Sequence, residues 1–109
     1  MSNITNREIK LSYHDSFYPD TFILVRKQIS FYKLNEKYFF RSYNGEYLGV
    51  FYLVSIKTFN FNDVDTELSF LHKNTTPEIY IQILEYHNFK KFDILSRLIF
   101  TNQKQFSDE

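Results

Sequence analysis

The sequence predicts an α+β domain: a small mixed β-barrel of roughly five to six strands, with two short helices between a β-hairpin and the last strand. Three observations support this prediction. Residues 37–57 are rich in aromatic and β-branched side chains around an Asn-Gly dipeptide, which is typical of a hairpin. Residues 62–88 change to apolar spacings of three and four, which are typical of helices. Residues 92–101 return to a strand-like pattern.

Composition limits the class of protein. The chain has 109 residues, which suits one domain over residues 1–109 with its core between residues 7 and 101. Aromatic residues make up 20% of it, far more apolar surface than a disordered chain carries. There is no Cys, which excludes disulfides, thiolate metal ligands and cysteine catalysis. The amino end is polar and no apolar run approaches the length of a membrane span, so we expect a cytoplasmic protein that does not associate with membranes.

Two strands are predicted before the hairpin. Residues 8–13 alternate apolar and polar side chains, which indicates a strand with one wet face. Residues 14–20 contain a proline and read as a turn or short helix. Residues 21–27 (TFILVRK) form a second strand that is apolar on both faces until Arg26 and Lys27. The basic end of this strand is therefore expected at a solvent-exposed rim.

The hairpin is predicted to lie at the centre of the fold. Asn44 and Gly45 both tolerate positive φ, so a two-residue type I′ turn is expected between its arms. One face of the second arm is wholly apolar and is predicted to be core. Its side chains are Leu48, Val50, Tyr52, Val54 and Ile56. The opposite face is mostly apolar too, which favours a strand covered on both sides, as in a small barrel or a sheet backed by helices.

The first helix is expected to start at a cap formed by Asn62 or Asp63. Val64, Leu68 and Leu71 then lie at i, i+4 and i+7, which places them on one face. We expect this face to pack against the sheet.

A second helix is expected to follow almost at once. Thr76 suits the cap position, Pro77 the first helical position, and Glu78 adds a favourable charge in the first turn. Its apolar stripe consists of Ile79, Tyr80, Ile83, Leu84 and His87. Asn88 marks its end, and residues 92–101 are expected to form the last strand.

Basic and aromatic residues alternate between positions 26 and 41. This stretch holds five cations and one acid, so its local charge is +4 although the whole chain is neutral. Cations that follow phosphates and rings that stack on bases are what a single-stranded nucleic acid site needs. The candidate phosphate contacts are Arg26, Lys27, Lys33, Lys37 and Arg41, and the candidate stacking rings are Tyr32 and Tyr43. The alternative is that the rings are core and the cations are the solvated face of the same strands.

Catalytic and metal-binding patterns are not found in the sequence. His14, His72 and His87 have no ligand-like spacing. There is no Gly-rich phosphate loop and no nucleophile elbow. We therefore expect no catalytic residues, no metal and no cofactor.

The order of elements resembles the PUA-like superfamily, in particular its ASCH-type domains. Three segments resemble parts of the family: TFILVRK its strand that ends in Arg, KLNEKYFF its entry to the hairpin, and TTPEIYIQILEYHNFKKFDILSRLIF its closing helix and strand. The resemblance covers most of residues 7–101. It implies a β-barrel that binds RNA.

Some ASCH-type proteins resemble amidohydrolases that act on modified nucleosides. The resemblance implies that their working groups are a Lys and a Thr before the conserved Arg, and a Glu after the hairpin. Only Arg26 carries over, because YPDT at residues 18–21 replaces the Lys-Thr segment and Leu24 is apolar. The Glu position falls near His72, with Glu67 close by.

Small plasmid- or phage-borne PUA-like regulators of bacteria are similar to this chain in size. The expected function is therefore RNA binding by a non-catalytic regulator or accessory factor. Two alternatives stay open: an ASCH-like amidohydrolase, and a protein-interaction module or homodimer.

Overall fold

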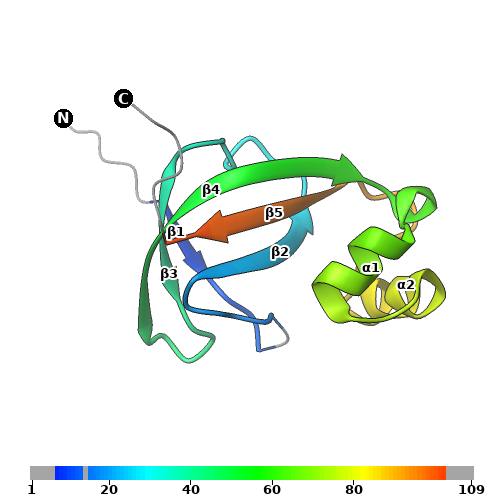
Figure 1. The fold of residues 1–109 in the computed structure, drawn as a ribbon, viewed down its shortest axis with the longest axis horizontal. Helices are drawn as coiled ribbons and strands as arrows, with labels where there is room; N and C mark the ends of the chain where they lie inside the picture. Colours follow the sequence, from blue (N-terminus) through cyan, green and yellow to red (C-terminus); the bar gives the residue numbers. More distant parts are fainter. Residues whose placement is uncertain (1–6, 14, 103–109) are drawn as a thin grey trace.

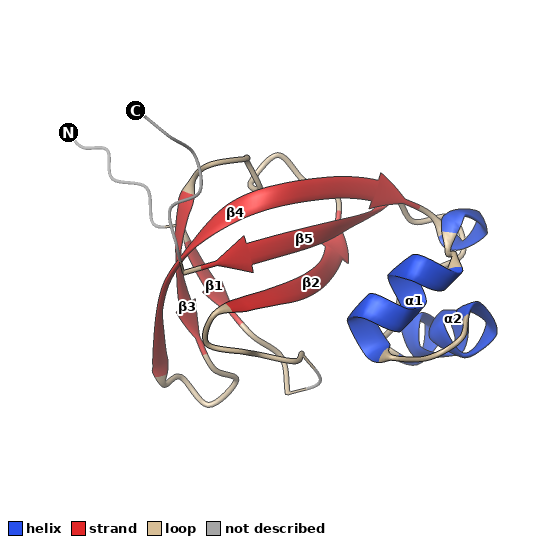
Figure 2. Ribbon diagram, in the orientation of Figure 1, coloured by secondary structure: helices blue, strands red, loops and turns tan. Residues whose placement is uncertain are grey.

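The computed structural model describes residues 7–13 and 15–102. These residues form an α+β fold in which a five-stranded sheet curls into a half-barrel and a helical pair lies at one end of it (Figures 1 and 2). The elements in chain order are β1 (Glu8–Lys10), β2 (Thr21–Lys27), β3 (Lys37–Arg41), β4 (Tyr47–Phe59), the 3₁₀ helix η1 (Phe61–Asp63), α1 (Thr66–Lys73), α2 (Pro77–Tyr86) and β5 (Leu95–Thr101). The predicted class is confirmed, with five strands curled into an incompletely closed barrel.

The sheet is mixed and is built around β4. Its strand order is β1-β3-β4-β5-β2, with β1 parallel to β3 and every other pair antiparallel. The first part of β4 pairs with β3, and the part from Tyr52 to Phe59 pairs with β5. One long strand thus joins the two halves of the sheet, and the bend along it produces the half-barrel.

The predicted core face of β4 is wrong over its central part. Phe51 is 3% and Leu53 0% exposed, whereas the predicted residues Val50 and Tyr52 are only half-buried. The cause is two β-bulges, at Leu48 opposite β3 and at Val54 opposite β5. Each bulge adds one residue and inverts the alternation of faces beyond it. Leu48 and Ile56, outside the two bulges, consequently pack against the same core as Phe51 and Leu53.

The turn of the hairpin also differs from the prediction. Ser42 N donates to Glu46 O at 2.8 Å and Gly45 N donates to Ser42 O at 2.9 Å, which makes a three-residue loop. Gly45 has φ +93°, and Asn44 is not among the residues with positive φ. This is the arrangement of a turn followed by a glycine bulge, not a type I′ turn. The Asn44 side chain instead accepts hydrogen bonds from Ser42 Oγ and Glu46 N, which stabilise the loop.

The predicted strand bounds are correct for β2 but wrong at the end of β1 and at the start of β5. β2 has the predicted bounds, Thr21–Lys27. β1 stops at Lys10, although Leu11 N still donates to Arg41 O at 2.8 Å. β5 begins at Leu95 instead of Phe92, whose side chain is exposed to solvent.

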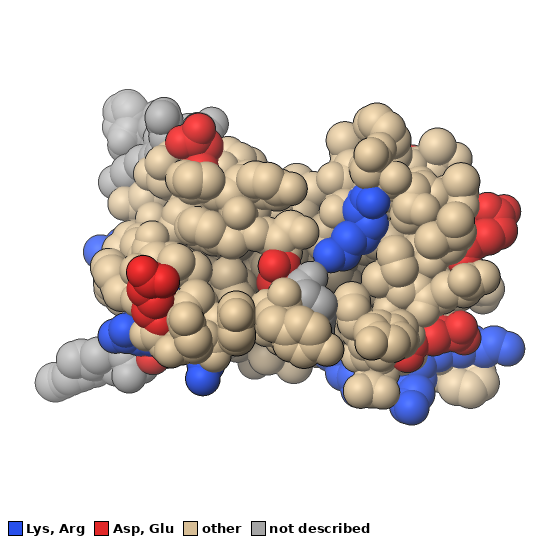
Figure 3. Space-filling view, turned by 90° about the horizontal axis from the view of Figure 1, so that it is seen from below, with Lys and Arg blue, Asp and Glu red and all other residues tan. Residues whose placement is uncertain are grey.

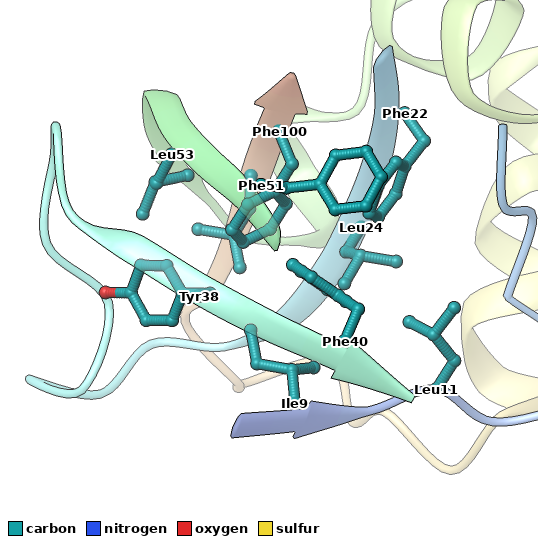
Figure 4. Close-up of a cluster of buried hydrophobic side chains, with 10 residues drawn as sticks. Ile9, Leu11, Phe22, Leu24, Tyr38, Phe40, Phe51, Leu53 and Phe100 are labelled. Atoms are coloured by element: carbon teal, nitrogen blue, oxygen red, sulfur yellow. The ribbon is translucent and has the colours of Figure 1, made fainter. Parts of the chain in front are cut away.

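Two apolar clusters hold the fold together. The first fills the half-barrel and is dominated by aromatic rings in edge-to-face contact (Figure 4). The second lies between the end of the sheet and the helices. It consists of Val25, Phe59, Phe61, Leu68, Tyr80, Leu84 and Leu95. Because β2 contributes Leu24 to the first cluster and Val25 to the second, it is covered on both faces, as its sequence predicted.

The second helix was predicted more accurately than the first. Thr76 caps α2 and Pro77 opens it, as expected. The cap of α1 is Asp65, whose carboxylate accepts the Leu68 N–H at 2.9 Å, not Asn62 or Asp63. Leu71 is exposed, so the predicted buried face of α1 is wrong at this residue. Within the described part of the chain, no helix has both the length and the apolar character needed to cross a membrane.

Candidate nucleic-acid interface

An open groove lies between the carboxyl end of β2 and the end of α2. Its volume is about 420 Å³. It is lined by Arg26, Lys27, Ile29, Tyr32, His87, Asn88 and Phe89. A second groove of about 490 Å³ shares Ile29 and Tyr32 with it and continues toward Ile56 and Ser96. Cationic, aromatic and amide side chains from distant parts of the chain thus meet at one surface.

The path of β2 explains why cations reach this groove. The strand is buried on both faces through Val25, and the next two residues emerge where the sheet ends. Gln28 N still donates to Ile94 O at 2.9 Å, so the backbone pairing extends one residue past the end of β2. As the sequence predicted, β2 therefore ends with its two cations at the rim of the sheet.

Tyr32 is held at the boundary between the groove and the barrel. It packs against the barrel core and lies 5.2 Å from the Phe31 ring in an edge-to-face contact. Burial raises the pKa of its hydroxyl, and the charge of Arg26 partly offsets this rise. The ring is thus rigidly placed and only partly accessible.

The structure brings together three of the seven predicted contact residues. Arg26, Lys27 and Tyr32 line one groove. Lys33 lies in the connection between β2 and β3, and the other three predicted contact residues lie along β3 or beyond its end. These are Lys37 at its start, Arg41 at its end and Tyr43 in the exposed hairpin loop. Five strand residues span roughly 13 Å, so β3 spreads these groups over the surface.

Most of the predicted cations are paired with acids. Arg26 binds Asp15, with Nη2 2.7 Å from Oδ2. Lys27 Nζ lies 3.6 Å from Asp93 Oδ2. Arg41 pairs with Glu8 and also lies over the Tyr47 ring, with 5.6 Å from its Cζ to the ring centroid. In the described residues, Lys33 and Lys37 have no carboxylate within 4 Å.

This pairing reduces the charge excess that the sequence suggests. Acids from other segments offset three of the five cations of residues 26–41, whereas Lys33 and Lys37 keep their charge. On the face seen in Figure 3, Lys and Arg side chains are interspersed with Asp and Glu. Binding to nucleic acid would therefore depend on local geometry at the groove more than on a broad basic surface.

A partly buried polar cluster lies next to the groove and was not predicted from the sequence. His72 on α1 and Tyr80 on α2 are joined by a hydrogen bond of 2.6 Å between Nδ1 and Oη. They line a cavity of about 20 Å³ together with Asp15 and His87, and His87 also lines the groove. A cavity of this size holds about one water molecule.

Burial perturbs the titration of this cluster. It lowers the pKa of His72 to about 4, helped by the neighbouring charge of Lys73. Burial also lowers the pKa of Lys73 and raises that of Tyr80. His72 and Tyr80 are on different helices, so no local spacing in the sequence could reveal the pair.

Comparison of the chain with protein-family models, curated proteins and solved structures finds no match. Among the described residues, no three His, Asp or Glu side chains gather closely enough to hold a metal ion. The groove and its charges are therefore the basis for assigning a function.

Proposed function

We propose that this protein is a PUA-like, non-catalytic RNA-binding module that acts in the cytoplasm as a regulator or accessory factor. The observation that carries the proposal is the groove in which Arg26 and Lys27 lie beside Tyr32 and Phe89. Cations of this kind track phosphates, and ring faces stack on unpaired bases with little sequence preference. The mixed, curled half-barrel with a helical pair is compatible with a PUA-like fold.

The dimensions of the groove favour a short stretch of single strand. Its two parts measure about 420 and 490 Å³. Both parts are open to solvent, so they would contact one side of a strand without enclosing it. Asn88 and Gln28 are exposed and add hydrogen-bonding groups at the two parts of the groove, where they can contact base edges. Because the groove holds only two cations, it binds few phosphates, and the affinity for RNA falls only slowly as the salt concentration rises.

Replacing both groove cations is expected to weaken RNA binding. The double variant Arg26→Ala with Lys27→Ala should lower the slope of log K against log salt by about 1.4, since each single-strand phosphate contact contributes about 0.7. Fluorescence anisotropy with a labelled pool of single-stranded and hairpin RNAs, at low and near-physiological salt, measures this change.

Two controls accompany this measurement. Lys57→Ala removes one charge from an exposed residue outside the groove and should leave affinity unchanged, whereas Lys27→Ala alone should reduce it. Thermal unfolding of the double variant is needed because Arg26→Ala leaves the Asp15 carboxylate without its guanidinium. A folded double variant with wild-type affinity and slope would rule out the groove as the RNA site.

A homodimer formed through the helices is the second candidate. The helical end of the molecule exposes large apolar side chains: Phe70, Leu71, Ile79, Tyr86, Phe92 and Ile94. Ile79 and Tyr86 lie seven residues apart, on one stripe of α2. If this surface pairs two chains, Ile79→Glu with Tyr86→Glu should convert a dimer to a monomer in sedimentation analysis. A wild-type protein that sediments as a monomer at high concentration would exclude this candidate.

The small cavity beside the groove does not favour the hydrolase alternative. The titratable groups His72 and Lys73 border the cavity of about 20 Å³, which has room for a water molecule but not for a nucleoside.

A further inference from the structure

Two carboxylates form ion pairs with the two cations of the groove. Arg26 donates from Nη1 to Asp15 Oδ1 at 3.1 Å and from Nη2 to Asp15 Oδ2 at 2.7 Å, so both terminal nitrogens of the guanidinium are engaged. This two-nitrogen edge is the one that binds a phosphate in bidentate fashion. Lys27, the next residue, pairs with Asp93 at 3.6 Å.

Both carboxylates are held in place by the backbone in the same way. Asp15 Oδ2 accepts the Ser12 N–H at 2.7 Å, and Asp93 Oδ2 accepts the Lys90 N–H at 2.7 Å. Each acid is thus oriented by an N–H group three residues before it. The two acids come from separate loops, on either side of the two adjacent cations, and neither depends on a long flexible side chain for its position.

We infer that Asp15 and Asp93 are built-in competitors of RNA phosphates: they neutralise the groove until a ligand displaces them. This inference rests on the proposed RNA-binding function and concerns how the same site is regulated. A phosphate that approaches Arg26 must replace two charge-assisted hydrogen bonds, so weak or isolated phosphates are rejected. An RNA strand that also stacks a base on Tyr32 or Phe89 gains enough binding free energy to break the Arg26–Asp15 ion pair.

The two ion pairs differ in strength. The Asp15 side chain is 6% exposed and bound in bidentate geometry, whereas Lys27 is 59% exposed and its pair is long. Exposed pairs contribute little, while buried charge-assisted pairs are roughly twice as strong as neutral hydrogen bonds. Asp15 is therefore the main competitor and Asp93 the minor one.

The test compares neutral variants of the two acids. Asp15→Asn is expected to tighten binding of a labelled single-stranded RNA pool about tenfold at low salt, because the Arg26 guanidinium no longer has to leave a carboxylate before it binds a phosphate. Asp93→Asn should tighten it about twofold, because its pair is exposed. Glu46→Gln is the matched control, since it removes one exposed charge at the hairpin, away from the groove, and should have no effect.

The outcomes separate this inference from the function itself. If neither wild type nor Asp15→Asn binds RNA at low salt, the proposed function fails and the inference fails with it. If wild type binds RNA and both aspartate variants bind it with wild-type affinity, Asp15 and Asp93 are not competitors, but the proposed function stands. Equal tightening by Glu46→Gln would also overturn the inference, because it would reflect net charge alone. Should Asp15→Asn fail to fold, Asp93→Asn decides the question.

Discussion

Replacing Phe22 by alanine is expected to lower the free energy of unfolding by about 3–5 kcal/mol. The side chain is 2% exposed, and its ring lies 5.0–5.6 Å from the rings of Phe17, Phe40, Phe51 and Phe100. Figure 4 shows the last three of these rings together with Phe22. Since domains of this size are stable by about 5–15 kcal/mol, this loss is a large fraction of the total stability. Urea or thermal unfolding measures the loss.

Phe92→Ala is the matched control for this prediction. The same chemical change is made at a side chain that is 89% exposed, so the effect should stay within about 0.5 kcal/mol. Equal losses in the two variants would show that the ring cluster does not form the core of the fold.

Stability is expected to fall as the pH is lowered from about 6.5 to 4, by up to about 3 kcal/mol from His72. Burial lowers the pKa of His72 to about 4 in the folded chain, while an unfolded histidine titrates near 6.5. Between these values the unfolded chain binds a proton that the folded chain does not. Above this window both states are neutral and below it both are protonated, so this contribution stays constant outside it. Urea unfolding at a series of pH values measures the slope.

His72→Asn isolates this contribution from the carboxylates, which also titrate in acid. The amide can keep a hydrogen bond to Tyr80 Oη but does not titrate, so the variant should lose stability less steeply between pH 6.5 and 4. Parallel profiles for wild type and variant would contradict the buried, neutral state of His72.

Local patterns were enough to predict the elements that depend on neighbours in sequence. The bounds of β2 follow from an apolar run that ends in two cations, and the start of α2 follows from Thr76 and Pro77. Both signals act within a few residues, through alternation and capping. The buried face of α1 was predicted less well, because Leu71 is exposed to solvent and Val64 lies before the start of the helix.

The faces of β4 show where periodicity stops being sufficient. A period of two is reliable only while the register is unbroken, and the bulges at Leu48 and Val54 break it. Bulges arise where one long strand must pair with β3 and β5 in a curled sheet, so they depend on partners that lie elsewhere in the chain. Gly49, an isolated glycine in the strand with φ +128°, is a local signal of the first bulge, whereas the residues around Val54 carry no such signal for the second.

The sequence by itself determined the α+β class, the central hairpin, the helical pair and the presence of cations at the end of β2. Only the tertiary structure decided that Asp15 and Asp93 pair with those cations and that His72 contacts Tyr80 in a partly buried cluster. The physical reason is the separation along the sequence over which each kind of interaction acts. Alternation and caps act between residues a few positions apart, whereas ion pairs and buried hydrogen bonds form between segments that only the folded chain brings together.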